Sequence, residues 1–367
     1  MLILWILIGS VILFAAQWSV YSRYWDRKLR IYFRFSERTV TEGESVGLVE
    51  RIENRKLLPL PTFGYRYKIY RNYASGGTGE EPLVLQRKLA LPAHRAVVNR
   101  AKINSLTRGV YAIGEITLSA ADLFYISRLE RPAESASSLT VYPAKIPVQK
   151  LALPVRLLLG SIATRRMAQE DPFALKAIRP YEIYDSPRII NWKASARSGE
   201  LKVNQYDHTT DEALIFLLDM GSGTVEDREE MLRLASSLSQ LFLRRGVSVS
   251  LLGNGRNCMN GLPVRVKAGA DAGHQITVDE TLAHINLSHP AIKSFQSFLA
   301  GVSKESMQKA LPVVISADYT DEALHAFQET PGTRGGYFLS VNGSGKTRTE
   351  GGITLINWDA REREVRL

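Results

Sequence analysis

The feature that most restricts the fold of this chain is its uncharged beginning. Residues 2–21 (LILWILIGSVILFAAQWSVY) contain no Asp, Glu, Lys or Arg. A helix of this length rises about 30 Å, which matches the hydrocarbon thickness of a bilayer. The segment therefore predicts a transmembrane anchor over residues 1–22, with everything that follows folding as a body attached to a membrane.

The charges beside this segment predict its orientation. Arg23, Arg27, Lys28 and Arg30 follow it directly and only Asp26 opposes them, whereas the α-amino group alone precedes it. By the positive-inside rule, we expect a single-pass protein of the cell membrane with its N-terminus outside and its soluble domains in the cytoplasm. A signal peptide is the alternative, but the segment lacks a basic start and a clear small-residue cleavage site.

Composition limits the remaining classes. The chain of 367 residues is 45% hydrophobic and 23% charged, which indicates a folded protein long enough for two domains. The lone cysteine, Cys258, excludes an internal disulfide framework and suits a reducing compartment. The formal net charge is +10, but beyond the basic cluster after residue 22 it gathers in no single segment, so we expect no nucleic-acid partner. A contiguous basic face that binds anionic lipid or nucleic acid remains the alternative.

Two regions of different pattern follow the anchor. Residues 30–147 consist of short runs rich in Val, Ile, Thr, Tyr and Phe, such as 97–103 and 139–142, separated by Gly, Pro and Asn. This pattern predicts an all-β, sandwich-like domain. A linking segment, residues 148–211, joins it to the second region.

Residues 212–367 alternate between apolar runs and helical periods. Buried strands are predicted at 212–219, 247–253, 311–318 and 336–341, and helices at 226–246, near 276–286, at 289–302 and at 321–329. This alternation predicts a doubly wound parallel sheet. The expected fold class is therefore α+β and multi-domain: a transmembrane helix, a β-sandwich-like domain and an α/β domain.

Residues 340–347 (SVNGSGKT) resemble a nucleotide-binding phosphate loop. Gly345, Lys346 and Thr347 match the end of the G-x-x-x-x-G-K-[ST] pattern, but Ser340 stands where its first glycine belongs. A phosphate loop leads into a helix, whereas residues 351–358 (GGITLINW) predict a strand. We therefore expect a turn, in a hairpin or an exposed connection, and no ATP binding.

Residues 179–201 carry the densest pattern in the chain. They match R-x-Y-x-x-G-D-x-x-R-x-I-[DN]-W-x-x-[ST]-A-R-x-G-x-L at Arg179, Tyr181, Asp185, Arg188, Ile190, Asn191, Trp192, Ser195, Ala196, Arg197, Gly199 and Leu201. With this signature the chain resembles domain-of-unknown-function family 58. The one departure is Tyr184, where the family carries a glycine that can adopt a positive φ.

The resemblance implies a fold, a role and partners. It implies that residues 212–367 form a von Willebrand factor A-like domain, and that the partner is a MoxR-type AAA+ ATPase, with a transglutaminase-like membrane protein as a further partner. The ATPase would supply the nucleotide chemistry. We therefore expect a membrane-anchored, cytoplasm-facing scaffold or interaction protein that is not an enzyme and has no cofactor.

A degenerate metal site also follows from the resemblance. Von Willebrand factor A-like domains bind Mg²⁺ through D-x-S-x-S, and Asp219 stands at the acidic position, but Gly221 and Gly223 replace both serines. We expect Ser222 to point elsewhere because it lies one residue off register, whereas Thr224 and Asp318 could add oxygen ligands. Mg²⁺ binding is therefore expected to be weak or absent.

The signature side chains suggest a charge network. One possibility is a network of ion pairs, with Trp192 as an apolar anchor, among Arg179, Asp185, Arg188 and Arg197. The other is that the arginines bind a carboxylate or phosphate of a partner. Ser195 has no adjacent base and is not expected to be a nucleophile.

An alternative of another class is a metal-dependent hydrolase or nuclease built from Asp185, Glu200 and Lys202, with Asp219. It requires residues 199–203 (GELKV) to form a strand with Glu200 and Lys202 on one face. It also requires the carboxylates of Asp185 and Glu200 to converge on a metal.

Overall fold

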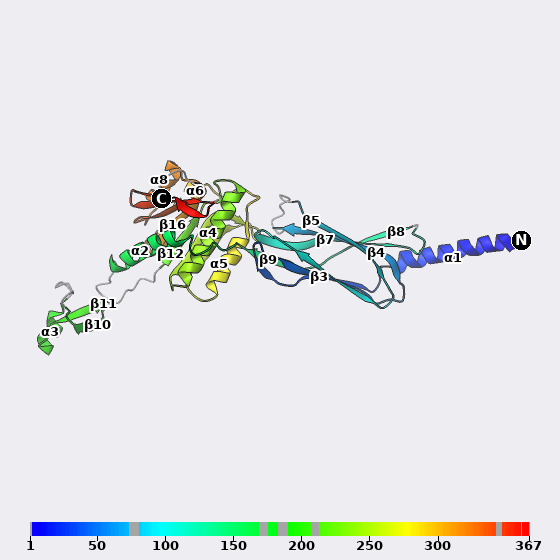
Figure 1. Ribbon diagram of the computed structural model, residues 1–367, viewed down its shortest axis with the longest axis horizontal. Coiled ribbons are helices and arrows are strands. Elements are labelled where there is room, and N and C mark those ends of the chain that lie inside the picture. Colours follow the sequence, from blue (N-terminus) through cyan, green and yellow to red (C-terminus); the bar gives the residue numbers. More distant parts are fainter. Residues whose placement is uncertain are drawn as a thin grey trace. The chain divides into compact units, whose positions relative to one another are not determined.

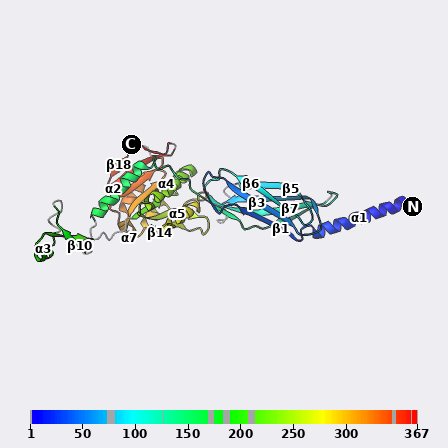
Figure 2. The same cartoon turned by 60° about the horizontal axis from the view of Figure 1, so that its bottom comes forward.

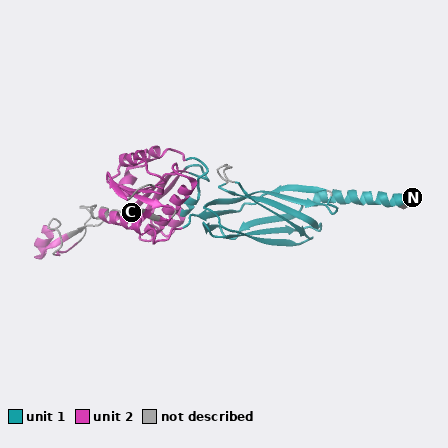
Figure 3. Ribbon diagram, turned by 45° about the horizontal axis from the view of Figure 1, so that its top comes forward, with its two compact units in different colours: residues 1–144, 256–262, 279–290 teal, residues 145–255, 263–278, 291–367 magenta. Residues whose placement is uncertain are grey.

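The computed structural model describes residues 2–72, 81–125, 127–168, 175–182, 190–206, 213–342, 347–360 and 362–366. The chain divides into two compact units (Figure 3). Unit 1 comprises residues 1–144, 256–262 and 279–290, and unit 2 comprises residues 145–255, 263–278 and 291–367.

The chain begins with the helix α1 (Leu2–Tyr24), drawn in blue in Figure 1. Within the described residues, it is the one helix long and apolar enough to cross a membrane by length and composition, a test that an N-terminal signal sequence also passes. The end of this helix belongs to the core of unit 1: Tyr21 in its last turn and Trp25 just after it are buried, and the Tyr21 hydroxyl donates to the carbonyl of Pro59 at 2.9 Å.

Unit 1 contains two sheets. The first has the order β1-β3-β6, with β1 (Leu29–Phe35), β3 (Val46–Asn54) and β6 (Ala96–Ile103) all antiparallel. The second has the order β2-β9-β7-β4-β5, with β8 on β7; its strands are β2 (Thr39–Thr41), β4 (Leu60–Arg71), β5 (Leu83–Leu91), β7 (Gly109–Ala121), β8 (Arg128–Ala133) and β9 (Ser138–Tyr142). Only the short pair β2 and β9 runs parallel.

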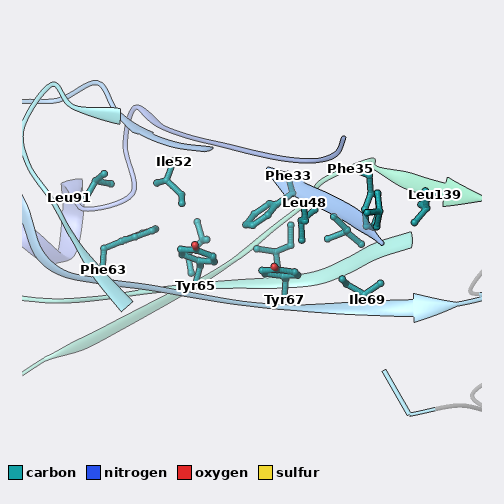
Figure 4. Packing of buried hydrophobic residues seen from close by; sticks show 14 of the residues in the cluster. Phe33, Phe35, Leu48, Ile52, Phe63, Tyr65, Tyr67, Ile69, Leu91 and Leu139 are labelled. Atoms are coloured by element: carbon teal, nitrogen blue, oxygen red, sulfur yellow. The ribbon is translucent and has the colours of Figure 1, made fainter. Parts of the chain in front are cut away.

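The two sheets enclose one apolar core. Alternate residues of β3, among them Leu48 and Ile52, point inward and are fully buried. Phe63 and Tyr67 of β4 meet them from the other sheet, and Figure 4 shows these side chains filling the space between the strands. The strands predicted at 97–103 and 139–142 are confirmed as β6 and β9. Their side chains alternate between the two faces of a sheet, which favours strands.

A charged residue sits inside this core. Glu50 lies on the inward face of β3 and accepts hydrogen bonds from the hydroxyls of Tyr65, at 2.5 Å, and Tyr67. Arg87 pairs with it at 3.2 Å, and Asn99 donates to Tyr65 at 3.0 Å. Burial, reinforced by the bonds to Glu50, raises the pKa of both tyrosines, so each hydroxyl keeps its proton and remains a donor.

A second buried charged residue in unit 1, Arg108, caps the carboxyl end of a helix. Arg108 is fully buried just before β7, and its Nη1 donates to the carbonyls of Leu282, Ala283 and Ile285 at 2.8, 3.0 and 2.9 Å. These carbonyls lie at the end of α5 (His274–Ala283) and in β15 (Ile285–Asn286). The last carbonyls of a helix have no donor within it and carry partial negative charge, which a cation satisfies.

Unit 2 is built on the sheet β14-β13-β12-β16-β17-β19-β18, with β15 on β13 and β20 on β19. The pairs β12/β13, β12/β16, β16/β17 and β17/β19 are parallel, as the alternation predicted. The strands are β12 (Ala213–Leu218), β13 (Ser248–Asn257), β14 (Pro263–Gly269), β16 (Leu311–Ser316), β17 (Gly336–Ser340), β18 (Arg348–Glu350), β19 (Ile353–Asp359) and β20 (Glu364–Arg366).

Helices cover both faces of this sheet. On one face, Ile215 and Leu217 of β12 share a core cluster with α6 (Phe295–Ala300), α7 (Lys304–Lys309) and α8 (Asp321–Glu329). Leu214, Phe216 and Leu218 alternate with them on the strand and are fully buried on the opposite face. A strand buried on both faces explains why this stretch reads as a continuous apolar run.

The opposite face carries α2 (Ala152–Ala168), α4 (Val225–Leu243) and α5 (Figures 1 and 2). The indole Nε1 of Trp358 on β19 donates to Glu230 of α4 at 3.3 Å. The hydroxyl of Tyr337 on β17 donates to the Leu157 carbonyl of α2 at 2.9 Å.

Two local predictions need correction. Of the two alternatives for the connection after residue 341, the hairpin is wrong, because the strands at 336–341 and 351–358 are parallel neighbours, β17 and β19. The antiparallel turn lies instead between β18 and β19, and residues 343–346 of the phosphate-loop-like stretch lie outside the described residues. The helix predicted near 276–286 ends at Ala283, and of the segment 289–302 only α6 is helical.

Candidate functional site

The carboxyl ends of β12 and β16 form the first candidate site. The chain passes from β12 to β13 on one side and reaches β16 on the other, so the strand order reverses between β12 and β16. In open α/β sheets, ligands bind outside the carboxyl ends of the strands at such a reversal.

Asp219 is the centre of a polar cluster at this edge. It is buried, and its Oδ1 accepts from the Gly221 amide at 3.0 Å and from Asn254 Nδ2 at 3.1 Å. Its Oδ2 accepts from the Ser316 hydroxyl at 3.1 Å. Asn254 also accepts from the Met220 amide at 2.7 Å, so the cluster ties β12, β13 and β16 together.

Ser222 corrects a prediction. Instead of pointing elsewhere, its hydroxyl lies 2.9 Å from the Ser316 hydroxyl and accepts from the Ala317 amide at 3.2 Å. The cause is that β12 ends at Leu218 and the chain turns at 220–221, so strand alternation no longer applies at Ser222. Gly223 continues this turn with a φ of +71°. A side chain on Gly223 would lie 2.2 Å from Cβ of Ala317, so only glycine fits this turn.

The oxygens of this cluster do not fit a Mg²⁺ site as they stand. Asp219 is its one carboxylate, and both carboxylate oxygens already accept from protein donors. Ser316 is shared between Asp219, Ser222 and the Asp318 carbonyl, and the Asp318 side chain is exposed. No group of three or more His, Cys, Asp or Glu within the described ranges is arranged to hold a metal. Mg²⁺ prefers several open oxygens in octahedral geometry, so no chemical step is derived through a metal here.

Thr224 begins α4 and does not join the Asp219 cluster. Its hydroxyl accepts from the Asp227 amide at 3.3 Å, and Asp227 Oδ2 accepts from the Thr224 amide at 2.8 Å, which is a capping box. Burial acts to raise the pKa of Asp227, but hydrogen bonds from Thr224 and Asn342 outweigh it and lower this pKa.

Thr224→Ala is expected to lower the unfolding free energy by about 1–2 kcal/mol, the usual value of a threonine cap. Because the folded-state pKa of Asp227 is lowered, its carboxylate stabilises the fold above the ordinary Asp range, and this stability is lost as the pH falls through the folded pKa. The variant should therefore lose less stability than wild type between pH 6 and pH 3. Thermal unfolding at several pH values measures both effects.

Thr320→Ala provides the control. Thr320 caps α8 by accepting from the Ala323 amide at 3.1 Å, and alanine stands at the position that Asp227 takes in α4. It should cost similar stability at pH 6 and leave the pH dependence as in wild type. Equal pH profiles for wild type and both variants would contradict the role of Asp227.

The signature segment forms a second candidate site. A two-stranded sheet pairs β10 (Leu175–Pro180) with β11 (Lys202–Tyr206), and the short helix α3 (Trp192–Ser198) precedes β11. Asn191 caps α3 through the Ala194 amide at 2.9 Å. The Ser195 hydroxyl donates to the Asn191 carbonyl at 2.8 Å and accepts from the Lys202 amide at 2.9 Å, so it holds the helix against the strand.

The predicted charge network stays a prediction, because two of its four members lie outside the described residues. Trp192 is 68% exposed, so the prediction of an apolar anchor is wrong, and Arg197 is exposed as well. Arg179 lies 3.9 Å from Glu182, and Tyr181 contributes a backbone bond to Leu201 at 2.9 Å. The other predicted members, Asp185 and Arg188, lie with Tyr184 outside the described residues.

The local requirement of the hydrolase alternative is not met. The strand begins at Lys202, and Glu200 is exposed in the turn before it, after Gly199 has closed α3 with a φ of 73°. Since Asp185 lies outside the described residues, its distance from Glu200 stays untested and the alternative remains a prediction.

Asn254 and Ser316 are the site residues that the sequence reasoning missed. Each is a polar residue in or just after an apolar run, Asn254 in β13 and Ser316 at the end of β16. The rule that carboxyl ends of parallel strands meet at one edge could have found both.

Together these features define a mixed α/β chain with several sheets and an N-terminal apolar helix. Residues 177–334, which include α3 and the Asp219 cluster, match the family model described as "Protein of unknown function DUF58". The match supports the predicted family resemblance for this part of the chain. No curated protein matches.

Three solved structures show low similarity. They are the CARDB domain of a Pyrococcus furiosus protein in complex with di-metal ions, the Pseudomonas fluorescens alkylpurine DNA glycosylase AlkC bound to DNA with an abasic site analog, and the putative ApaA protein from Bordetella pertussis. Their identities are 12%, 13% and 11% and their TM-scores 0.21, 0.22 and 0.23. Each match covers 31% of this chain, and 93%, 30% and 92% of the respective structure. TM-scores this low carry no argument about fold or function.

Proposed function

We propose that the protein is a membrane-anchored, cytoplasm-facing scaffold that docks a partner protein through its signature segment. The observation that carries the proposal is the exposed apolar surface of that segment. Trp192 is 68% exposed, and Ile178 and Leu201 are also exposed. Tryptophan is enriched at the energetic centres of protein interfaces and is costly to leave in water without a function.

The local structure supports a docking role. Trp192 opens a helix that the Asn191 cap and the Ser195 hydrogen bonds hold in place. A side chain presented on fixed backbone loses little conformational entropy on binding, which favours affinity. The basic Arg197 on the same helix adds a group that can pair with a carboxylate of the partner.

The anchor belongs to the same proposal. Phe14 packs its ring 5.8 Å from that of Phe124, and Trp18 Nε1 donates to the Ser127 hydroxyl at 2.9 Å. With Tyr21 and Trp25 in the core, α1 makes contacts that support a helix retained in the mature protein. The basic residues after it support an N-terminus outside and units 1 and 2 in the cytoplasm.

The sheet order supports a von Willebrand factor A-like unit 2. With the short strands β15 and β18 left out, the strands from β14 to β19 have the order 3-2-1-4-5-6 when they are numbered along the chain. The short connection at 258–262 makes β14 antiparallel to β13. The partner that the family resemblance implies is a MoxR-type AAA+ ATPase, with a transglutaminase-like membrane protein as a further candidate. In this proposal, the ATPase supplies nucleotide hydrolysis.

The test is a binding assay of the detergent-solubilised full chain with the purified MoxR-type ATPase of the same host. Trp192→Ala should weaken binding about tenfold or more, as expected for a central interface aromatic. Ile276→Ala, which truncates another exposed apolar side chain, 58% exposed on α5, is the matched control and should bind as wild type. Undiminished binding by Trp192→Ala, or no binding by wild type, would overturn the proposal.

A further inference from the structure

A basic pocket of about 670 Å³ lies in unit 1 at the end of α1. Its walls come from the last turns of α1, the connection 55–59 between β3 and β4, and His94 between β5 and β6. Arg27, Lys28, Arg55 and Lys56 all line it. We call it the foot pocket. Its charge suits an anionic ligand.

Lys56 is the residue that indicates a ligand. Its side chain is only 9% exposed, and its Nζ has no hydrogen-bond partner within the described part of the chain. Asp26, the acidic residue whose charge acts on Lys56, is already paired with Arg131 at 2.7 Å. A buried ammonium without an acceptor is costly, so an acceptor from outside the chain would relieve this cost.

The backbone holds Lys56 in this position. Its amide donates to Asn54 Oδ1 at 3.2 Å, and its carbonyl accepts from the His94 amide at 3.2 Å. Asn54 is itself buried and donates to the carbonyls of Leu58 and Pro92, each at 3.0 Å. The unpartnered ammonium is therefore part of an ordered loop. Burial lowers the pKa of Lys56 to about 8, with Asp26 acting in the opposite direction, so the group is still mainly cationic at pH 7.

The rim of the foot pocket is apolar. Leu57, next to Lys56, is 81% exposed, and Val20 and Tyr24 of α1 line the same pocket. A small water-soluble anion gains nothing from such a rim. An amphiphile places its charged head on the basic wall and its chains along the apolar helix.

A second exposed apolar loop accompanies α1. Leu123, Phe124 and Tyr125, between β7 and β8, are exposed, and Phe124 lies against Phe14 of α1. Phe14 and Trp18 precede Arg23 by about 7–14 Å of helix rise, on the apolar side of the basic cluster. Unit 1 thus carries apolar groups at the depth where a membrane-embedded α1 would meet the lipid interface.

We propose that the foot pocket binds the headgroup of an anionic phospholipid, with the phosphate accepting a hydrogen bond from Lys56 Nζ. Arg27 and Lys28 provide further charge, whereas Arg55 is already paired with Glu53 at 3.0 Å, and Leu57 and Val20 contact the acyl chains. The inference rests on α1 lying in a membrane, as proposed above.

The test measures co-purified lipid. The full chain is solubilised in detergent micelles that contain equal amounts of phosphatidylglycerol and phosphatidylcholine, and bound lipid is quantified by native mass spectrometry. Wild type should retain phosphatidylglycerol at least about fivefold over phosphatidylcholine, and Lys56→Gln should bring the ratio near one. Lys88→Gln removes the same charge from an exposed position on β5 and should keep the preference.

Thermal unfolding distinguishes loss of lipid binding from a folding defect in the variant. Because Lys56 is buried without a partner, Lys56→Met should raise the thermal midpoint of the lipid-free chain and remove the further rise that phosphatidylglycerol gives to wild type. Inorganic phosphate at equal concentration should give no such rise, because it lacks acyl chains. A rise with phosphate as large as with phosphatidylglycerol would overturn the lipid assignment, as would an unchanged lipid preference in Lys56→Gln.

The anchor is tested separately. Flotation of the full chain with neutral phosphatidylcholine vesicles depends on α1 and not on the foot pocket. Failure to float would overturn the anchor and, with it, the lipid assignment that rests on it. Equal retention of the two lipids in micelles by a chain that floats would overturn the foot pocket and leave the anchor standing.

Discussion

Gly223→Ala is expected to destabilise unit 2 by about 2–5 kcal/mol, combining about 1–2 kcal/mol for a left-handed backbone with about 1–3 kcal/mol for overpacking. The position has a φ of +71°, and an added Cβ would lie 2.2 Å from Cβ of Ala317 and 3.0 Å from Oδ2 of Asp227. Since the turn also directs Ser222 toward Ser316, the variant should disturb the cap of α4 and the Asp219 cluster together. Thermal unfolding of the full chain in detergent measures the loss.

Gly246→Ala is the matched control for this prediction. Gly246, just after α4, has a φ of +76°, but no atom lies within 4 Å of the Cβ that alanine would add. It should therefore cost only the backbone strain of about 1–2 kcal/mol. Equal losses for the two glycines would show that crowding at Ala317 is relieved by movement of the chain and would contradict the prediction.

Arg108→Met should cost about 3 kcal/mol or more, because three backbone carbonyls each lose a hydrogen bond from a charged donor that contributes about 1.5–3 kcal/mol. Methionine retains an unbranched stem but no donor, so the carbonyls of Leu282, Ala283 and Ile285 lose the bonds from Nη1. Arg108→Lys keeps the charge without the planar fork and should fall between wild type and Arg108→Met. Arg100→Met, at an exposed position of β6, should change stability little.

A titration separates loss of charge from loss of packing. Burial is the main cause that lowers the pKa of His284, Glu280 opposes it, and Arg108 lowers it further. In Arg108→Met this pKa should move up toward the ordinary histidine value, and in Arg108→Lys it should stay close to that of wild type. Histidine NMR titration measures it. An unchanged pKa in Arg108→Met would contradict electrostatic contact between the two side chains.

The strand and helix pattern was predictable where one period dominates. The apolar run at 212–219 and the helical period at 321–329 became β12 and α8 because each element buries a continuous or one-sided apolar surface. Pairing was harder to predict. The strands at 336–341 and 351–358 suggested a hairpin, and the interposed β18 made them parallel neighbours instead.

The candidate sites were less predictable because they depend on loops and distant contacts. Alternation placed Ser222 on the wrong side, because the strand ends at Leu218 and a turn at 220–221 comes before Ser222. Trp192 looked like a core residue by type, but only its surroundings determine burial, and the segment that carries it is too small to enclose it. No sequence pattern around Lys56 or Arg108 predicts the role of either residue. What distinguishes both is that their charged groups are removed from water when the chain folds.

The burial of Tyr21 and Trp25 in unit 1 has a mechanical consequence. Because the end of α1 is part of the sandwich core, the helix cannot rotate independently of the sandwich. We therefore expect α1 and the sandwich to tilt together as one rigid body. In the proposed arrangement, in which α1 spans a membrane, a thinner or thicker bilayer changes the preferred tilt of the helix and would rotate the whole of unit 1 by the same angle. In such an arrangement, lipid composition would determine the orientation of unit 1 through the thickness of the bilayer, as well as surrounding the anchor.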